Sequence, residues 1–425
     1  MLLLWAILFS DNVFASDSTV LYKQLNKFFP GIQIVSMPSQ QPFVLVWKLM
    51  IPQYLHHEDT SVGKFMQQVF VYHRGFKKPN VMVTEGYEIK DRVYEPTLML
   101  DANQISIEYR FFGESVPSKM DWSLLNHHQA MEDYKKIQDA LRKIYKKCWL
   151  VTGISKGGTT AALYSLTYPT SVQATMAYVA PFPVAQEDSR TIEHYKMKVG
   201  TPDCRRKIQQ FQRTLLMHRE ALKPKLMELA KSEQVQFTIG LDQVIDYASV
   251  EYPFSFWQWG FGCNTIPGER ASIDEIFEHI EEVVDFNYYD DKTILQLLPA
   301  YYQFLTEYGY YGFDTTGLSD LLVTSHLSNL NFCPKDADLS YHGEYMQSMR
   351  HHAEHMSHNI IYIYGGADTW TSCAVDLKPT SNAIKLVLYQ GGHRTRLRDF
   401  QEHDRNTVYK ALRKWMKAKV DPLPY

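Results

Sequence analysis

The sequence predicts an α/β fold, in which a mostly parallel sheet is covered by helices on both faces and a helical cap is inserted. Three observations predict it. Short apolar runs alternate with helical patterns near both ends of the chain. The alternation stops between about residues 186 and 345, where long helical patterns are found. A serine between glycines, Ser155, follows one apolar run and precedes a helical pattern. We therefore expect a core made of residues 16–185 and 346–425, split by a cap at 186–345.

The first part of the core is expected to contain strands and two helices. The strand-like runs lie at 81–87, 104–109, 148–153 and 174–182. Residues 131–147 have apolar side chains at helical spacing. A second helix is expected from Lys156 to about Tyr168, where Pro169 ends it. This order of strands and helices is typical of a parallel sheet that is buried on both faces.

The cap and the last part of the core follow in sequence. Long helical patterns at 205–233 and 272–286 fall within the expected cap. Strand-like runs return within 359–370 and 383–393, and a final helix is expected at 407–419. The sequence shows no internal repeat and no low-complexity linker, so the cap is read as an insertion into one sheet domain.

Composition and charge exclude several classes of protein. Hydrophobic residues make up 45% of the 425 residues and charged residues 21%, which is typical of a globular chain with a large core. The net charge of −3, without a long basic run, gives no indication of nucleic-acid binding. No stretch after the N-terminus is apolar enough to predict a membrane span. The oligomeric state cannot be read from these features.

The first 15 residues resemble an export signal. A short apolar run is followed by Val13, Phe14 and Ala15, and small residues commonly precede a cleavage point. The usual basic start is missing, so a buried N-terminal segment is the alternative. The pattern predicts a signal peptide at 1–15 and a secreted or periplasmic protein.

An exported protein could form disulfides from its five cysteines. These are Cys148, Cys204, Cys263, Cys333 and Cys373. The odd number leaves at least one thiol free if all pairing is within the chain. Cys204 with Cys263 is one pairing within the cap region, but the sequence does not determine connectivity. The absence of a C-x-x-C pattern argues against a cysteine-based metal or redox site.

Three polar residues form the strongest functional pattern. Ser155 stands in "GISKG", a G-x-S-x-G motif that exposes a nucleophilic serine on a tight strand-to-helix turn in α/β-hydrolases. A serine needs a base to remove its proton and an acid to orient that base. Asp368 and His393 each follow a later strand-like run, in the chain order Ser, Asp, His. The alternative is that Ser155 only tolerates a tight turn.

Such a serine also requires donors for the negative charge that develops on the substrate oxygen. The backbone N–H of Lys156 is the expected first donor because it directly follows the nucleophile. The N–H of Gly86 or of Tyr87, in the loop "TEGY", is the expected second donor. The side chain of Lys156 has no evident role, and it could pair with a carboxylate or point to solvent.

A competing motif predicts a metal site instead. His351, Glu354 and His355 match H-x-x-E-H, and the two histidines would share one face of a helix. The segment is polar, and no distant third ligand stands out. A solvated surface helix explains it more simply, so we expect no metal and no cofactor.

Several stretches resemble one family of serine peptidases. "GISKGGTTAALYSLTYP", "MAYVAPF", "VTEGYEI", "VEYPFSFWQWG" and "IYGGADTW" are similar to the bacterial secreted tripeptidyl aminopeptidases, also called prolyl tripeptidyl peptidases. "ISIEYRFFGES" and "FLTEYGYYGF" are similar to the related prolyl carboxypeptidase and dipeptidyl peptidase group. The resemblance extends over about 50–400. It implies an exopeptidase with post-proline preference that acts on peptides with a free N-terminus, with Ser155, Asp368 and His393 as its triad.

An aminopeptidase must bind the free ammonium group of its substrate, and a buried carboxylate does this well. Glu85, Glu108 and Glu307 each lie among apolar or aromatic residues, where an unpaired carboxylate is costly. They are therefore candidates for substrate binding, and a structural salt bridge, for example of Glu108 or Glu114 with Arg110, is the alternative.

The aromatic run at 252–262 could bind a proline ring. Trp257 and Trp259 are its candidate lining residues, and packing inside the cap is the alternative. Other functions also remain open at this point: an esterase or carboxypeptidase on the same scaffold, or a peptide-binding relative without activity.

Overall fold

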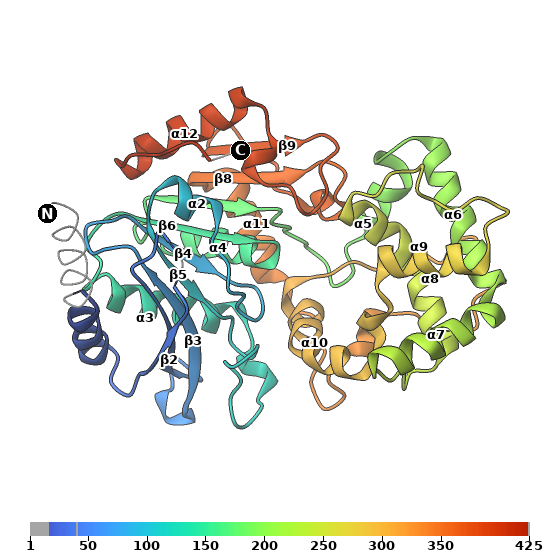
Figure 1. The fold of residues 1–425 in the computed structure, drawn as a ribbon, viewed down its shortest axis with the longest axis horizontal. Coiled ribbons are helices and arrows are strands. Elements are labelled where there is room, and N and C mark those ends of the chain that lie inside the picture. The colour runs from blue at the N-terminus through green and yellow to red at the C-terminus, as the bar shows by residue number, and fades with distance from the viewer. Residues whose placement is uncertain (1–16, 40, 424–425) are drawn as a thin grey trace, which may run out of the picture.

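The structure is a computed structural model that describes residues 17–39 and 41–423. The expected signal peptide at 1–15 lies outside the described residues. Figure 1 shows a sheet domain, formed by both ends of the chain, beside a group of helices formed by its middle. This is the arrangement that a helical insertion into a sheet domain predicts, although the exact domain boundaries remain a prediction.

One nine-stranded sheet forms the centre of the first part, in the order β1-β2-β3-β5-β4-β6-β7-β8-β9. Its strands are β1 (Gln33–Met37), β2 (Leu45–Tyr54), β3 (Lys64–His73), β4 (Asn80–Thr84), β5 (Asn103–Ile107), β6 (Trp149–Ile154), β7 (Ala174–Tyr178), β8 (His358–Gly365) and β9 (Asn382–Leu388). All neighbours from β5 to β9 are parallel, whereas β1, β2 and β3 are antiparallel to their neighbours. The predicted α/β class and mostly parallel sheet are therefore confirmed.

The antiparallel strands β1 to β3 were not expected from the sequence. Strand β3 is buried along most of its length but contains Gln67 and Gln68, which interrupt its apolar pattern. Both amides donate inside the fold, Gln67 to the Glu108 carbonyl and Gln68 to the Glu108 carboxylate. The strand was therefore not recognised from the sequence, because polar residues with tertiary partners interrupt its apolar pattern.

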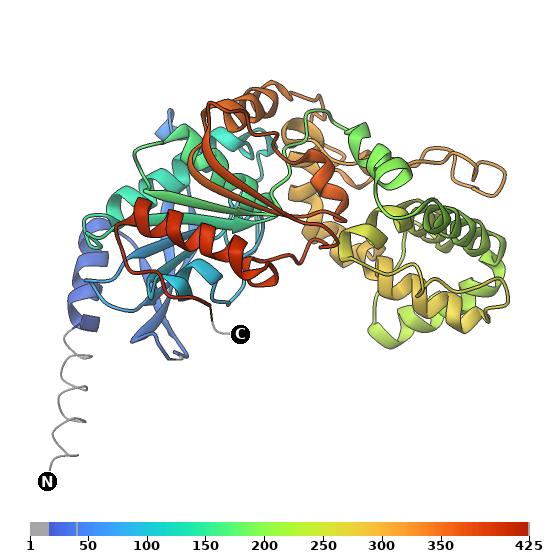
Figure 2. The same ribbon diagram turned by 90° about the horizontal axis from the view of Figure 1, so that it is seen from above.

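Helices cover both faces of the sheet. The helices α3 (His127–Leu141), α4 (Lys156–Thr167) and α11 (Glu344–Met356) contribute to one large apolar cluster. The helices α2 (Glu95–Met99) and α12 (Glu402–Met416) pack on the other face in a second cluster. Figure 2 shows α12, in red, lying along its face of the sheet. The two apolar layers fix the sheet and thereby the strand ends that bear the predicted site.

The inserted part is helical, as expected. Its main helices are α5 (Ser189–Glu193), α6 (Pro202–Met217), α7 (Arg219–Glu233), α8 (Leu241–Trp259), α9 (Ile273–Val284) and α10 (Asp291–Gln303). The single pattern expected at 205–233 is in fact two helices, because the chain leaves helical geometry at His218, where ψ is 14°. No glycine or proline marks this break, so the periodic pattern alone could not reveal it.

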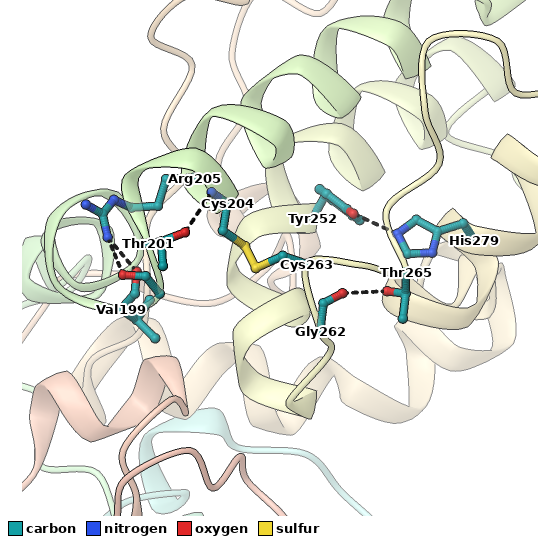
Figure 3. Close-up of a disulfide and its surroundings, with 10 residues drawn as sticks. Val199, Thr201, Cys204, Arg205, Tyr252, Gly262, Cys263, Thr265 and His279 are labelled. Carbon is teal, nitrogen blue, oxygen red and sulfur yellow. Dashed lines mark hydrogen bonds between the residues drawn. A yellow bond between two sulfur atoms is a disulfide. The ribbon is translucent and has the colours of Figure 1, made fainter.

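A disulfide joins Cys204, in the first turn of α6, to Cys263, just after α8 (Figure 3). The two Cα atoms are 5.5 Å apart, within the usual range for a disulfide. The pairing that the sequence left open within the cap is therefore present. Cys148, Cys333 and Cys373 have free thiols.

The helices within residues 17–39 and 41–423 lack the features of a membrane span. None of them is both long enough and apolar enough to cross a bilayer.

Candidate active site

Ser155 lies at the turn between β6 and α4 in a backbone conformation that non-glycine residues rarely adopt. Its φ is 58° and its ψ is −128°. A Cβ atom at Gly153 would lie 2.1 Å from the Gly157 carbonyl oxygen, and one at Gly157 would lie 2.5 Å from the Thr84 carbonyl oxygen. The glycines around Ser155 are therefore needed because backbone segments pass too close for any side chain. This is the geometry of a nucleophile elbow.

The two other predicted triad residues meet beside the sheet. Asp368 follows β8 and His393 follows β9, and His393 Nδ1 is 2.7 Å from Asp368 Oδ2. The other oxygen of Asp368 accepts a hydrogen bond from the Trp370 N–H. Asp368 is fully buried, so its carboxylate can hold the imidazole in one orientation. With Nδ1 bonded to Asp368, Nε2 of His393 is left to accept a proton.

Ser155 and His393 line one cavity of about 910 Å³ between the sheet domain and the cap. The core contributes Gly86, Tyr87 and Lys156 to its lining, besides the serine and the histidine. The cap contributes polar and aromatic side chains, among them Glu251, Trp259, Tyr288, Tyr289, Tyr301, Tyr310 and Tyr311. A substrate in this cavity would contact both parts of the protein.

The predicted oxyanion donors lie next to one another in this cavity. Lys156 is the first residue of α4, so its N–H has no acceptor within the helix. A Cβ atom at Gly86 would lie 2.7 Å from the Gly157 nitrogen, which shows how closely this loop approaches the elbow. The Tyr109 N–H donates to the Tyr87 carbonyl and fixes the far side of the loop. This close approach is compatible with the predicted oxyanion hole, which remains a prediction.

The side chain of Lys156 neither forms a salt bridge nor points to solvent, the two roles considered from the sequence. It is 1% exposed, and its Nζ donates to the Gly86 carbonyl at 2.7 Å. The same nitrogen lies 3.4 Å from the centre of the Tyr109 ring. Burial holds the pKa of Lys156 well below its usual value, and the negative charge of Glu307 partly opposes this shift. The lysine therefore ties the elbow to the oxyanion loop.

Of the three carboxylates predicted to bind substrate, Glu85 alone lines the cavity. The Tyr94 hydroxyl donates to it at 2.6 Å, and the Arg92 guanidinium lies 3.8 Å away. Burial raises the pKa of Glu85 to about 7. Its charge is therefore already partly compensated by protein groups.

Glu108 and Glu307 have structural partners and lie outside the cavity lining. Glu108 accepts hydrogen bonds from four groups: the Gln68 amide, the Ile89 N–H, the Glu114 N–H and the Ser115 hydroxyl. Glu307 accepts from the His127 N–H at 2.8 Å, and burial raises its pKa to about 7. The salt bridge considered for Glu108 is absent, because Arg110 pairs with Asp133 instead. Protein hydrogen bonds therefore hold Glu108 and Glu307, and neither is placed to bind a substrate in this cavity.

The two tryptophans predicted to line a proline pocket differ in their location. Trp259 lines the cavity, with its ring perpendicular to that of His393 and the two ring centres 6.0 Å apart. Trp257 is buried in the cap against Gly200, where a Cβ atom would lie 2.3 Å from the indole ring. Trp257 therefore packs inside the cap, which is the alternative stated for the aromatic run.

Glu251, which was not predicted from the sequence, also lines the cavity. It belongs to α8, and Ser255, Gln258 and Trp259 of the same helix line the cavity with it. The spacing of these residues places them on one helical face. Reading the aromatic run as a helix, rather than as a pocket motif, would have revealed this face.

The H-x-x-E-H motif lies on α11, away from the cavity lining. The rings of His351 and His355 stack with centres 4.1 Å apart, while Glu354 pairs with Arg350 at 3.0 Å. Within residues 17–39 and 41–423, no group of three His, Cys, Asp or Glu side chains is arranged to hold a metal ion. The expectation of no metal remains a prediction.

A serine elbow after a parallel strand, a cap inserted into the sheet domain and an Asp–His pair at later strand ends define an α/β-hydrolase. Residues 20–391 match the model of the PS-10 peptidase S37 family, and the chain belongs to this family. It is a serine peptidase.

The Prolyl tri/tetrapeptidyl aminopeptidase of Streptomyces mobaraensis is 30% identical over 350 residues, which cover 80% of this chain and 73% of that protein. The expected resemblance to tripeptidyl aminopeptidases is confirmed by this match. Among solved structures, VinJ matches 90% of this chain and 99% of its own, with 13% identity and a TM-score of 0.42. The proline iminopeptidase of Mycobacterium smegmatis matches 83% of this chain and 96% of its own, with 13% identity and a TM-score of 0.36.

Proposed function

We propose that this protein is a secreted exopeptidase that removes short peptides, chiefly tripeptides, from free N-termini and prefers to cleave after proline. The observation that carries the proposal is that Ser155 and His393, which pairs with the buried Asp368, border one cavity lined on its other side by the cap. The family and the Streptomyces relative, whose name specifies prolyl tri/tetrapeptidyl release, support the substrate class. The N-terminal export pattern supports secretion.

In the proposed mechanism, Ser155 Oγ attacks the carbonyl carbon of the scissile bond while His393 Nε2 takes its proton. The oxyanion is bound by the N–H of Lys156 and by that of Gly86 or Tyr87. The histidine then protonates the leaving amine, and the released peptide remains as an acyl group on Ser155. A water molecule, activated by His393, hydrolyses this acyl-enzyme. Asp368 orients the imidazole and stabilises its charge throughout.

The cap supports release from a chain end and a preference for proline. It closes one side of the cavity, which disfavours a long chain passing through. Trp259 and tyrosines of the cap supply flat apolar surfaces that suit a pyrrolidine ring. Carboxylates in the lining favour an amine terminus over an ester substrate. Arg92 also lines the cavity, but it already donates to the Tyr94 hydroxyl and lies 3.8 Å from Glu85, which reduces its pull on a terminal carboxylate.

Digestion of a mixed peptide pool tests the proposal. We expect mass spectrometry to show tripeptides released from N-termini, enriched for proline at the cleaved bond, and no products with Ser155→Ala. Residues released from C-termini would identify a carboxypeptidase. Cleavage of simple esters without cleavage of any peptide would identify an esterase.

A further inference from the structure

Glu251 is a buried carboxylate that the proposed catalytic steps do not use. It is 8% exposed and lines the cavity from the cap. The Ser255 hydroxyl donates to its Oε1 at 2.6 Å. Among the described residues, no donor reaches its buried Oε2 with hydrogen-bond geometry, although the Tyr311 hydroxyl lies close enough to favour the ionised carboxylate. An unsatisfied carboxylate oxygen at a cavity wall is costly unless a ligand completes it.

The surroundings of Glu251 offer no cation from the protein itself. Among the described residues, none forms an ion pair with it. The groups that face it are the Ser255 and Tyr311 hydroxyls, which favour its ionised form, and other tyrosines of the cap. Burial outweighs these hydroxyls and raises its pKa to about 7. Tyrosine rings also attract cations, so the chemistry of the whole group is that of an ammonium site.

We propose that Glu251 binds the free α-ammonium group of the peptide substrate, an inference that rests on the proposed aminopeptidase function. The ammonium donates to Oε2 and supplies the missing positive charge. Glu85 serves this purpose less well, because Tyr94 and Arg92 already compensate its charge. Glu307 lies outside the cavity lining.

The position of Glu251 on α8 also sets the length of the released peptide. The His393 N–H donates to the Gln258 carbonyl at 2.6 Å, so this turn of α8 lies against the loop that bears the histidine. Glu251 precedes Gln258 by seven residues, which corresponds to roughly 10 Å along a helix axis. Three extended peptide residues also span about 10 Å, whereas two span about 7 Å. The separation therefore favours tripeptide release.

The test compares the wild type with Glu251→Gln on tripeptidyl substrates that have free or acetylated N-termini. Glutamine keeps the shape of the side chain but removes its charge. We expect kcat/KM for the free-amine substrate to fall roughly 10–100-fold, the usual loss for a charged hydrogen bond. The acetylated substrate should react equally with both proteins. Glu281→Gln, which changes a half-buried cap carboxylate outside the cavity lining, should leave both rates unchanged.

Two results separate failure of this inference from failure of the proposed function. If wild type does not distinguish free from acetylated substrates, the aminopeptidase function is wrong and the inference falls with it. If wild type prefers the free amine and Glu251→Gln keeps that preference, the function stands but Glu251 is not the anchor. Labelling of Ser155 by a fluorophosphonate shows whether the variant has kept its reactive site. Preference of wild type for dipeptidyl over tripeptidyl substrates would overturn the length argument.

Discussion

At the residue scale, the side chain of Lys156 connects the elbow to the loop that bears Gly86. A buried lysine nitrogen that donates to one carbonyl and lies over an aromatic ring has little freedom to move. Its loss would leave the Gly86 carbonyl without this donor and release the loop. The lysine therefore acts as a positioning residue, through its side chain, for the proposed oxyanion donors.

Lys156→Met should lower kcat about 10–100-fold, somewhat less than the loss of a whole oxyanion donor. KM should change little, because the side chain supports the transition state rather than the bound substrate. Steady-state kinetics measures the two separately. Lys146→Met, at an exposed lysine, is the matched control. A raised KM with an unchanged kcat would show that Lys156 supports ground-state binding instead.

How well individual residues could be predicted depends on where their partners lie in the sequence. Ser155, Asp368 and His393 stand in local motifs at strand ends, so sequence alone could propose them. Glu108 and Glu307 look like binding residues until their hydrogen-bond donors are seen. Glu251 was not predicted, because the burial of its carboxylate depends on the tertiary structure. No local sequence pattern indicates it.

At the element scale, α8 links the cap to the catalytic loops. The Thr369 hydroxyl donates to the Phe254 carbonyl of α8, and the His393 N–H donates to that of Gln258. A Cβ atom at Gly392 would lie 2.8 Å from the Gln258 carbonyl oxygen, so this contact requires glycine. The helix that bears Glu251 is thus fixed relative to the histidine.

The disulfide should stabilise the cap around this helix. It closes a segment with a sequence separation of 59 residues between Cys204 and Cys263. Replacement of both cysteines by serine should lower the free energy of unfolding by about 2–5 kcal/mol. Thermal unfolding with and without dithiothreitol measures the effect. The reductant should lower the transition of wild type only, and an equal shift in the variant would contradict the account.

Elements with a simple hydrophobic pattern were predicted best. The parallel strands and α4 lie close to their expected ranges because apolar runs and helix signals coincide there. The break at His218 and the antiparallel strands β1 to β3 were missed, since neither depends on a local signal. Tertiary packing determines both.

At the scale of the whole molecule, three buried carboxyl groups make stability depend on pH. Glu85, Glu251 and Glu307 each have a pKa of about 7, raised by burial from the usual 4.5. As the pH rises from 4.5 to about 7, these carboxyl groups lose their protons in the unfolded chain but keep them in the folded protein. The folded protein thus binds more protons, and the free energy of unfolding falls as pH rises through this range.

Glu251→Gln should remove one of these contributions. Urea unfolding at pH 5 and pH 8 measures the fall in stability for each protein, and comparison with wild type cancels the contributions of histidines. We expect the fall to be smaller in the variant by about 1–3 kcal/mol. Equal falls would show that Glu251 titrates normally.

The central claim is that His393 and Asp368 activate Ser155, and covalent labelling tests it most directly. A fluorophosphonate probe should add one group to the wild type, and peptide mapping should locate it at Ser155. Ser155→Ala should remain unlabelled, and His393→Ala and Asp368→Ala should both label far more slowly, because triad residues act as a unit. Labelling at another serine, or an unchanged rate in His393→Ala, would contradict the account.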